Sequence, residues 1–135
     1  MIKKQFTLIL ENRPGALAKV ARQLSLENIN IDAISVAAST DMSLVQILAS
    51  NAARTRRILK KLSISFTVQD VCLLPLRNEP GMLWKVVSGL AKNNININYI
   101  YGTGNTVKSG SGMDYVVISA PDLKEVEACW QKVCS

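Results

Sequence analysis

The residues best suited to bind a small molecule lie in a short phrase that the chain contains twice. ENRPGAL runs from Glu11 to Leu17, and RNEPGML runs from Arg77 to Leu83. Each phrase holds an asparagine, whose side chain can donate and accept hydrogen bonds, two residues before a Pro-Gly pair. A helix that begins after this pair would present unpaired backbone amides at the positive end of its dipole, which suits a carboxylate. Glycine would let a ligand approach the backbone closely, so the phrase is chemically suited to a carboxylate ligand.

Catalysis and metal binding have no such support. The chain has no histidine, which excludes a Ser-His-Asp triad, a Cys-His pair and a histidine-ligated zinc site. It also offers no paired-carboxylate motif. Cys72, Cys129 and Cys134 are odd in number and lack the spacing of metal ligands, so we expect free thiols in a reducing cytoplasm. The sequence therefore predicts a protein that is not an enzyme and uses no cofactor and no metal.

The chain also lacks the signals of a membrane or secreted protein. Its apolar runs, such as VVISA at 116–120, are too short to cross a bilayer. Residues 1–15 have a basic start and a brief apolar run but no small-residue cleavage site, which argues against a signal peptide. We expect a cytoplasmic protein. Its 135 residues, 48% of them hydrophobic, suffice for one ordinary domain or two very small ones.

Much of the net charge of +6 lies in one segment, 52–62. Its basic residues are Arg54, Arg56, Arg57, Lys60 and Lys61. Such a cluster could contact phosphates. However, basic residues that alternate with Ile58, Leu59 and Leu62 are more often the solvated side of an amphipathic helix, and no aromatic residue between them could stack on a base. We favour the solvated helix and keep nucleic-acid binding as a disfavoured alternative.

The repeated phrase belongs to a longer internal repeat with a spacing of 66 residues, the difference between Pro14 and Pro80. The same spacing aligns NINI at 28–31 with NINI at 94–97, and the match continues without gaps to Ile34 and Ile100. A match of this length indicates a duplicated module. We therefore expect two domains, residues 1–69 and 70–135.

Both copies predict the same order of elements. A buried strand comes first, at 6–10 and 71–76. Proline then occupies the first turn of a helix, which ends at Asn28 or Asn94 because asparagine tolerates the left-handed conformation. Alternating isoleucine and polar residues at 29–32 and 95–98 predict a second strand with one buried face. A third strand (43–50 and 113–120) and a second helix (52–62 and 123–133) complete each copy.

This order, with a further strand from Ile64 in the first copy, predicts an α+β fold of two ferredoxin-like (βαββαβ) modules. The helices would cover one face of each antiparallel sheet, and polar residues would occupy the other. The second copy stops at Ser135, just after its second helix, and so lacks a last strand of its own. An edge left open in this way invites another strand, from the first copy or from a second chain.

The segment LENRPGALAKVARQLSLENINI, Leu10 to Ile31, resembles the opening of an ACT domain, a small ferredoxin-like module that senses amino acids in metabolic control. The resemblance covers both copies and thus nearly the whole chain. Its strongest points are the Asn-x-Pro-Gly turn and the NINI segment. A chain with two such modules and no attached enzyme is similar to stand-alone tandem ACT proteins.

The resemblance implies that ACT modules pair side by side, here as a homodimer, and that a free amino acid binds at the seam. Its carboxylate would meet the amides at the helix start, and its ammonium group would meet the backbone at the second strand of a neighbouring module. The matching residues are Leu10, Asn12, Arg13, Gly15, Ala16, Leu17, Asn30 and Ile31 in the first copy, and Leu76, Asn78, Gly81, Met82, Leu83, Asn96 and Ile97 in the second.

The implied function is non-catalytic regulation, in which the bound amino acid alters the assembly or the contact with a partner such as an enzyme of amino-acid metabolism. Two alternatives stay open. The Asn-x-Pro-Gly phrase is also a good strand-to-helix turn in which asparagine bonds to its own nearby backbone. Some ACT modules bind nothing and only hold subunits together, so a purely structural dimerisation module is the main competitor, with nearly equal weight for the second copy.

Several residues depart from the family pattern or between the copies. Serine-sensing members carry a histidine just before the turn, where this chain has Leu10 and Leu76, which argues against serine and for a more apolar wall. In the second copy Trp84, Tyr99 and Tyr101 replace smaller residues, for which we favour packing between modules over a wider ligand pocket. The glycine-rich segment 101–115 predicts a mobile hairpin loop and not a phosphate loop, since it does not open a helix.

Overall fold

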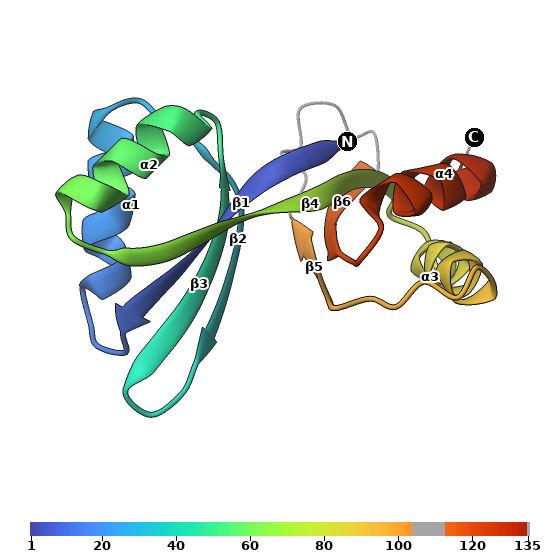
Figure 1. Ribbon diagram of the computed structural model, residues 1–135, viewed down its shortest axis with the longest axis horizontal. Coiled ribbons are helices and arrows are strands. Elements are labelled where there is room, and N and C mark those ends of the chain that lie inside the picture. The colour runs from blue at the N-terminus through green and yellow to red at the C-terminus, as the bar shows by residue number, and fades with distance from the viewer. Residues whose placement is uncertain (104–112, 135) are drawn as a thin grey trace. The chain divides into compact units, whose positions relative to one another are not determined.

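The computed structural model describes residues 1–103 and 113–134 (Figure 1). The chain forms two compact modules: the N-terminal module, Lys4–Gln69, and the C-terminal module, Asp70–Ser135 together with Met1–Lys3. The elements are β1 (Ile2–Glu11), α1 (Ala16–Leu26), β2 (Ile31–Ala38), β3 (Met42–Ala49), α2 (Ala52–Lys61), β4 (Ser65–Arg77), α3 (Met82–Lys92), β5 (Tyr99–Thr103), β6 (Met113–Ser119) and α4 (Leu123–Cys134). The mixed fold with antiparallel strands and four helices confirms the predicted class.

The N-terminal module has the strand order β2-β3-β1-β4, with α1 and α2 on one face of the strands (Figure 1). Strands β1 and β3 are antiparallel, with Phe6 opposite Ile47 and Leu8 opposite Val45. Because side chains alternate along a strand, these four residues share the face toward the helices and are all buried. From α1, Val20 and Leu24 complete the core, one helical turn apart.

The C-terminal module has the order β4-β6-β5, with α3 and α4 on one face (Figure 1). Strands β4 and β6 are antiparallel, and Cys72 lies opposite Ile118. The core joins these residues to Val86 and Leu90 of α3 and to Val126 of α4. It repeats the pattern of the N-terminal module.

The start of the chain pairs with β4 in the C-terminal module. The Leu73 amide donates to the Met1 carbonyl at 2.8 Å, and the Met1 ammonium donates to the Leu73 carbonyl at 3.3 Å. The same ammonium lies 2.9 Å from a carboxylate oxygen of Glu127 on α4. Within the described residues no strand follows α4. Of the two sources that the sequence left open for this edge, the structure shows the first copy.

The start of the second strand was predicted wrongly in both copies. Strand β2 begins at Ile31 and β5 at Tyr99, not at 29 and 95. Asn28 has φ 57°, the Asn28 amide donates to Ser25 and the Ile29 amide to Leu24, which together form a Schellman cap on α1. Ile29 therefore closes the helix and packs on Leu24 before the strand begins. The predicted helix-ending role of Asn28 is confirmed.

The face of the N-terminal sheet away from the helices is less polar than predicted. Ile9 and Leu44 lie opposite each other on β1 and β3, and they are 46% and 44% exposed. Met42, opposite Glu11, is also exposed. The hairpin predicted for 101–115 falls largely on residues 104–112, which lie outside the described part of the chain.

Truncating a core residue of β1 should cost far more stability than truncating its exposed neighbour. Leu8 is fully buried, so Leu8→Ala should lower the free energy of unfolding by about 2–5 kcal/mol. Ile9→Ala, the matched control, should lower it by less than about 1 kcal/mol. Urea denaturation measures both values, and equal losses would contradict the assigned faces of β1.

Candidate functional site

The Asn-x-Pro-Gly phrase folds as a tight turn before each first helix. In the N-terminal module the Ala16 amide donates to the Arg13 carbonyl at 3.3 Å, and Gly15 has φ 90° and ψ −15°. A positive φ at the third position, after proline, defines a type II turn and strongly favours glycine. Gly81 repeats the geometry with φ 90° and ψ −11°. Helices α1 and α3 thus begin at Ala16 and Met82, so proline lies in the turn and not in the first helical turn as predicted.

The turn uses one of the three amides that the sequence suggested were free. The Ala16 amide is used by the turn, which corrects the expectation that all three amides from Gly15 to Leu17 are unpaired. Among the described residues, no hydrogen bond from the Gly15 or Leu17 amide is found. Gly15 is exposed and Leu17 half-buried. These amides, together with that of Ala18, therefore remain as donors at the positive end of α1.

Asn12 ties this turn to the hairpin between β2 and β3. Its Nδ2 donates to the carbonyls of Ser39 at 2.7 Å and Thr40 at 3.4 Å, and its backbone amide donates to Asp41 at 2.8 Å. The simple turn interpretation proposed that the Asn12 side chain bonds to its own nearby backbone. The structure instead shows it bonded to the distant hairpin. Its Oδ1 atom is left as an acceptor for a donor group.

A pocket of about 360 Å³ lies beside the turn in the N-terminal module. Three predicted residues, Leu10, Arg13 and Ala16, line it. The sequence did not single out its other lining residues, which are Ile9, Glu11, Lys19, Val20, Met42, Leu62, Ser63, Ile64 and Ser65. The Arg13 Nε atom lies 2.7 Å from a carboxylate oxygen of Glu11. The pocket thus combines charges of both signs with an apolar wall that includes the buried Leu10.

The remaining predicted residues of the first copy, Asn30 and Ile31, line a second hollow of about 380 Å³ with Ala21, Ser25, Asn28 and Ile29. The Asn30 amide donates to Ser50 Oγ at 2.9 Å, its carbonyl accepts from the Ser50 amide at 2.9 Å, and its Nδ2 donates to Asp32 at 2.7 Å. Strand β2 is the edge of the sheet in this module. An approaching chain would meet this edge.

The turn and the start of β2 lie at opposite ends of α1. That helix has 11 residues, so its ends are about 16 Å apart at 1.5 Å per residue. The N-terminal module alone therefore does not bring the two groups of predicted residues together.

The equivalent residues of the C-terminal module are arranged similarly at the turn. Leu76 is buried, whereas Asn78 and Gly81 are exposed. The Met82 amide donates to Glu79 at 3.3 Å, as at the first turn. Further members of the predicted set differ in burial: Leu83 is 50% exposed, Asn96 is exposed and Ile97 is half-buried.

The bulky residues of the second copy behave differently from one another. Trp84 is 70% exposed, and its packing between modules stays a prediction. Tyr99 and Tyr101 are half-buried, and their rings stack with centroids 6.4 Å apart.

Cys72 and Cys129 are buried. Cys72 Sγ donates to the Leu123 carbonyl at 3.4 Å, and Cys129 Sγ accepts from Asn93 Nδ2 at 3.2 Å. Burial raises the pKa of the Cys72 thiol to about 11; the Glu127 carboxylate adds to the rise and the N-terminal ammonium opposes it. A protonated buried thiol is a poor nucleophile. The described residues contain no group of three or more His, Cys, Asp or Glu side chains arranged to hold a metal.

Helix α2 is amphipathic. Asn51 caps it by accepting from the Arg54 amide at 3.0 Å, and Thr55, Ile58 and Leu59 are buried. The basic residues Arg56, Arg57, Lys60 and Lys61 are exposed. This is the arrangement expected of a solvated helix.

The chain matches the sequence profile of the family described as "ACT domain pair" over residues 1–111. It belongs to the ACT domain pair family. The turns at 13–16 and 79–82 therefore follow the first strand of each ACT module. No curated protein matches the chain.

Solved structures share this ACT fold. Protein BT0572 from Bacteroides thetaiotaomicron is 27% identical, with a TM-score of 0.87, over 98% of this chain and 88% of that one. The regulatory subunit of aspartate kinase from Thermus thermophilus is 16% identical, with a TM-score of 0.69, over 100% and 96%. The corresponding subunit from Thermus flavus is 17% identical, with a TM-score of 0.61, over 100% and 96%. The two Thermus likenesses concern the fold. In the part of this ACT pair that the structure describes, no helix is long and apolar enough to span a membrane.

Replacing the turn glycine should cost backbone strain alone. A Cβ added at Gly15 would meet nothing within 4 Å, but its φ of 90° is unfavourable for other residues, so Gly15→Ala should lower the free energy of unfolding by about 1–2 kcal/mol. Gly102 is the matched control, because its Cβ also meets nothing and its φ is not positive. Gly102→Ala should be neutral or stabilising by about 0.4–1 kcal/mol. Urea denaturation of the two variants checks the contrast, which would vanish if the turn were not type II.

The buried Cys72 thiol should make stability depend on alkaline pH. Its pKa is raised to about 11 in the folded chain, above the ordinary value near 8.5. The contribution of the neutral thiol to the free energy of unfolding is therefore fully present below the unfolded pKa and is lost as pH rises toward 11. Relative to Cys72→Val, the wild type should lose about 1–2 kcal/mol of unfolding free energy between pH 8 and pH 10. Urea denaturation across this range measures the difference, and a constant difference would contradict the buried neutral thiol.

Proposed function

We propose that this ACT domain pair is a non-catalytic regulatory protein that binds a free amino acid at a seam between ACT modules of two chains. The observation that carries the proposal is the pair of free amides, from Gly15 and Leu17, at the start of α1. Both lie at the positive end of a helix dipole, where a carboxylate binds favourably. The turn that exposes them also borders a pocket of about 360 Å³.

A second chain is needed because the two halves of the proposed site are far apart within one module. The turn and the start of β2 lie at opposite ends of α1. In a symmetric pair joined along the β2 edges, each turn would approach the β2 start of the partner, and two equal sites would form. The edge position of β2 supports this pairing, since an uncovered edge presents unpaired amides and carbonyls.

The proposed roles follow from the chemistry of each group. The amides of Gly15 and Leu17 hold the ligand's carboxylate, with Arg13 adding positive charge. Asn12 Oδ1 and the backbone near Asn30 and Ile31 accept from its ammonium group. Leu10 provides an apolar wall, which favours an amino acid with an apolar side chain. The second copy, with Asn78, Gly81, Met82, Leu83, Asn96 and Ile97, offers a similar but bulkier site.

A ligand that binds only at the seam must favour the paired form, and this coupling is the proposed signal. The fold shared with the regulatory subunits of aspartate kinase supports a regulatory role. We propose an enzyme of amino-acid metabolism as the partner whose contact changes. The competing function is a purely structural dimerisation module. Nucleic-acid binding has only the exposed basic side chains of α2 in its favour.

A thermal-shift screen of the full chain against the common free amino acids tests the proposal. One amino acid should raise the melting temperature with concentration, by the equivalent of about 2.7 kcal/mol at 100 times its dissociation constant. Sedimentation should show that the same ligand promotes pairing. A flat screen with a folded dimer would favour the structural module.

A charge placed at the start of α1 locates the site. Ala18 is exposed in the first turn of α1, where an acidic residue suits the helix dipole and should not harm folding. Ala18→Asp should weaken the binding of the identified amino acid by about fivefold, because like charges about 4 Å apart near water repel by about 1 kcal/mol. Ala18→Asn is the isosteric control and should bind as the wild type does. Unchanged affinity in Ala18→Asp, measured by calorimetry, would contradict the helix-start site but not the ACT family.

A further inference from the structure

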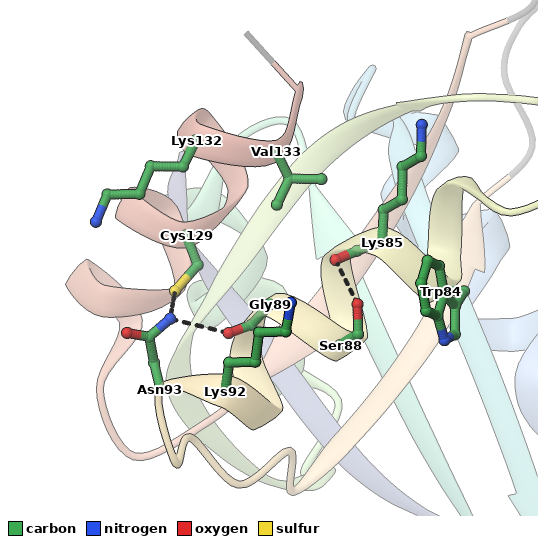
Figure 2. Close-up of a pocket in the computed structure, with 9 residues that line it drawn as sticks. All are labelled: Trp84, Lys85, Ser88, Gly89, Lys92, Asn93, Cys129, Lys132 and Val133. Atoms are coloured by element: carbon green, nitrogen blue, oxygen red, sulfur yellow. Dashed lines mark hydrogen bonds between the residues drawn. The ribbon is translucent and has the colours of Figure 1, made fainter.

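A separate hollow lies between α3 and α4 of the C-terminal module (Figure 2). Its volume is about 340 Å³, and it is lined by Trp84, Lys85, Ser88, Gly89, Lys92, Asn93, Cys129, Lys132 and Val133. None of these residues belongs to the proposed amino-acid site. The volume falls at the lower end of the range of small-molecule pockets.

The floor of this hollow is formed by Gly89 of α3 and Val133 of α4 and is apolar. Gly89 leaves the space open because it has no side chain. A Cβ at Gly89 would come within 3.3 Å of a Val133 methyl group, so a larger residue would crowd the two helices. Glycine inside a helix is unfavourable compared with alanine, and the first copy has Gln23 at the matching position. Beside Gly89, the Asn93 side chain donates to the Gly89 carbonyl at 2.9 Å and to Cys129 Sγ at 3.2 Å. Asn93 is thereby held at the floor.

The rim of the hollow is positively charged. Lys85, Lys92 and Lys132 line it, and no acidic residue does so. Figure 2 shows Trp84 and Lys132 on opposite sides of the hollow, with Gly89 and Val133 between them. An apolar floor beneath several ammonium groups complements a molecule with an apolar body and a negative charge.

Trp84 gives the hollow a flat wall. Its side chain is 70% exposed, so the face of its ring is accessible to a ligand. In the first copy the positions of Trp84 and Lys92 hold Ala18 and Leu26. The wall, the glycine and one of the rim charges are therefore all particular to the second copy.

We propose that this hollow is a second ligand site, which binds a small carboxylate carried on a flat apolar body. The apolar body lies over Gly89 and Val133 and against the Trp84 ring, and the carboxylate is met by the rim lysines. The site shares no residue with the proposed amino-acid site. The chain would then respond to two chemically different ligands.

Calorimetry on the full chain with two matched probes tests the class of ligand. The probes are 1-naphthylacetate, an anion, and 1-naphthylmethylamine, a cation, at one fixed ionic strength. The acid should bind with a dissociation constant of about 1 mM or lower. The amine should bind at least about tenfold more weakly, because the rim ammonium groups repel it.

Variants taken from the other copy locate the binding without threatening the fold. Trp84→Ala and Lys92→Leu install the residues that the first copy has at the same positions. Trp84→Ala should weaken the binding of 1-naphthylacetate by about tenfold, and Lys92→Leu should weaken it by about two- to fivefold. Lys124 is exposed on the same helix as Lys132 but does not line the hollow, so Lys124→Ala should leave the affinity unchanged.

Three results would overturn the proposal. They are equal affinity for acid and amine, unchanged acid binding in Trp84→Ala, and a wild-type dimer that Trp84→Ala converts to a monomer, which would mean that a second copy covers this face. Each is distinguishable from failure of the proposed amino-acid site. The melting-temperature response to an amino acid should persist in Trp84→Ala, whatever happens to the naphthyl acid.

Discussion

The left-handed backbone at both ends of the first helix in each copy is the constraint on which the rest of the fold depends. In the N-terminal module Gly15 has φ 90° before α1 and Asn28 has φ 57° after it. Few side chains tolerate this region, and the two residues decide where the helix starts and stops. The first leaves backbone amides at the helix start free for an anion. The second turns the chain so that Ile29 packs under α1 and β2 can begin at Ile31. Gly81 and Asn94 have the same left-handed conformation at the matching positions of the second copy.

The sequence predicted the repeat, the element types and the fold class because these depend on local periodicity and on residues with special backbone preferences. It placed Pro14 and the start of β2 wrongly, since a type II turn and a Schellman cap each depend on hydrogen bonds that periodicity does not reveal. The partner of Asn12 and the pocket wall from Leu62 to Ser65 come from residues far away in the chain. Only the folded module brings them to the turn.

The two copies show how one backbone can support different surfaces. In the N-terminal module the strong features lie at the helix start, where Arg13, Glu11 and Lys19 border an apolar pocket. In the C-terminal module they lie on the helical face, where Gly89 opens a hollow beneath Trp84. Both modules nevertheless keep the same pattern of strand pairing and of buried core residues. Side chains outside the core have therefore been free to diverge while the turns stayed the same.

The placement of Met1–Lys3 in the C-terminal module means that the duplicated halves are not separable pieces. A protein cut between Gln69 and Asp70 would leave the later fragment without the residues that hydrogen-bond to Leu73. One edge of its sheet would then be unpaired and open to pairing with another extended chain.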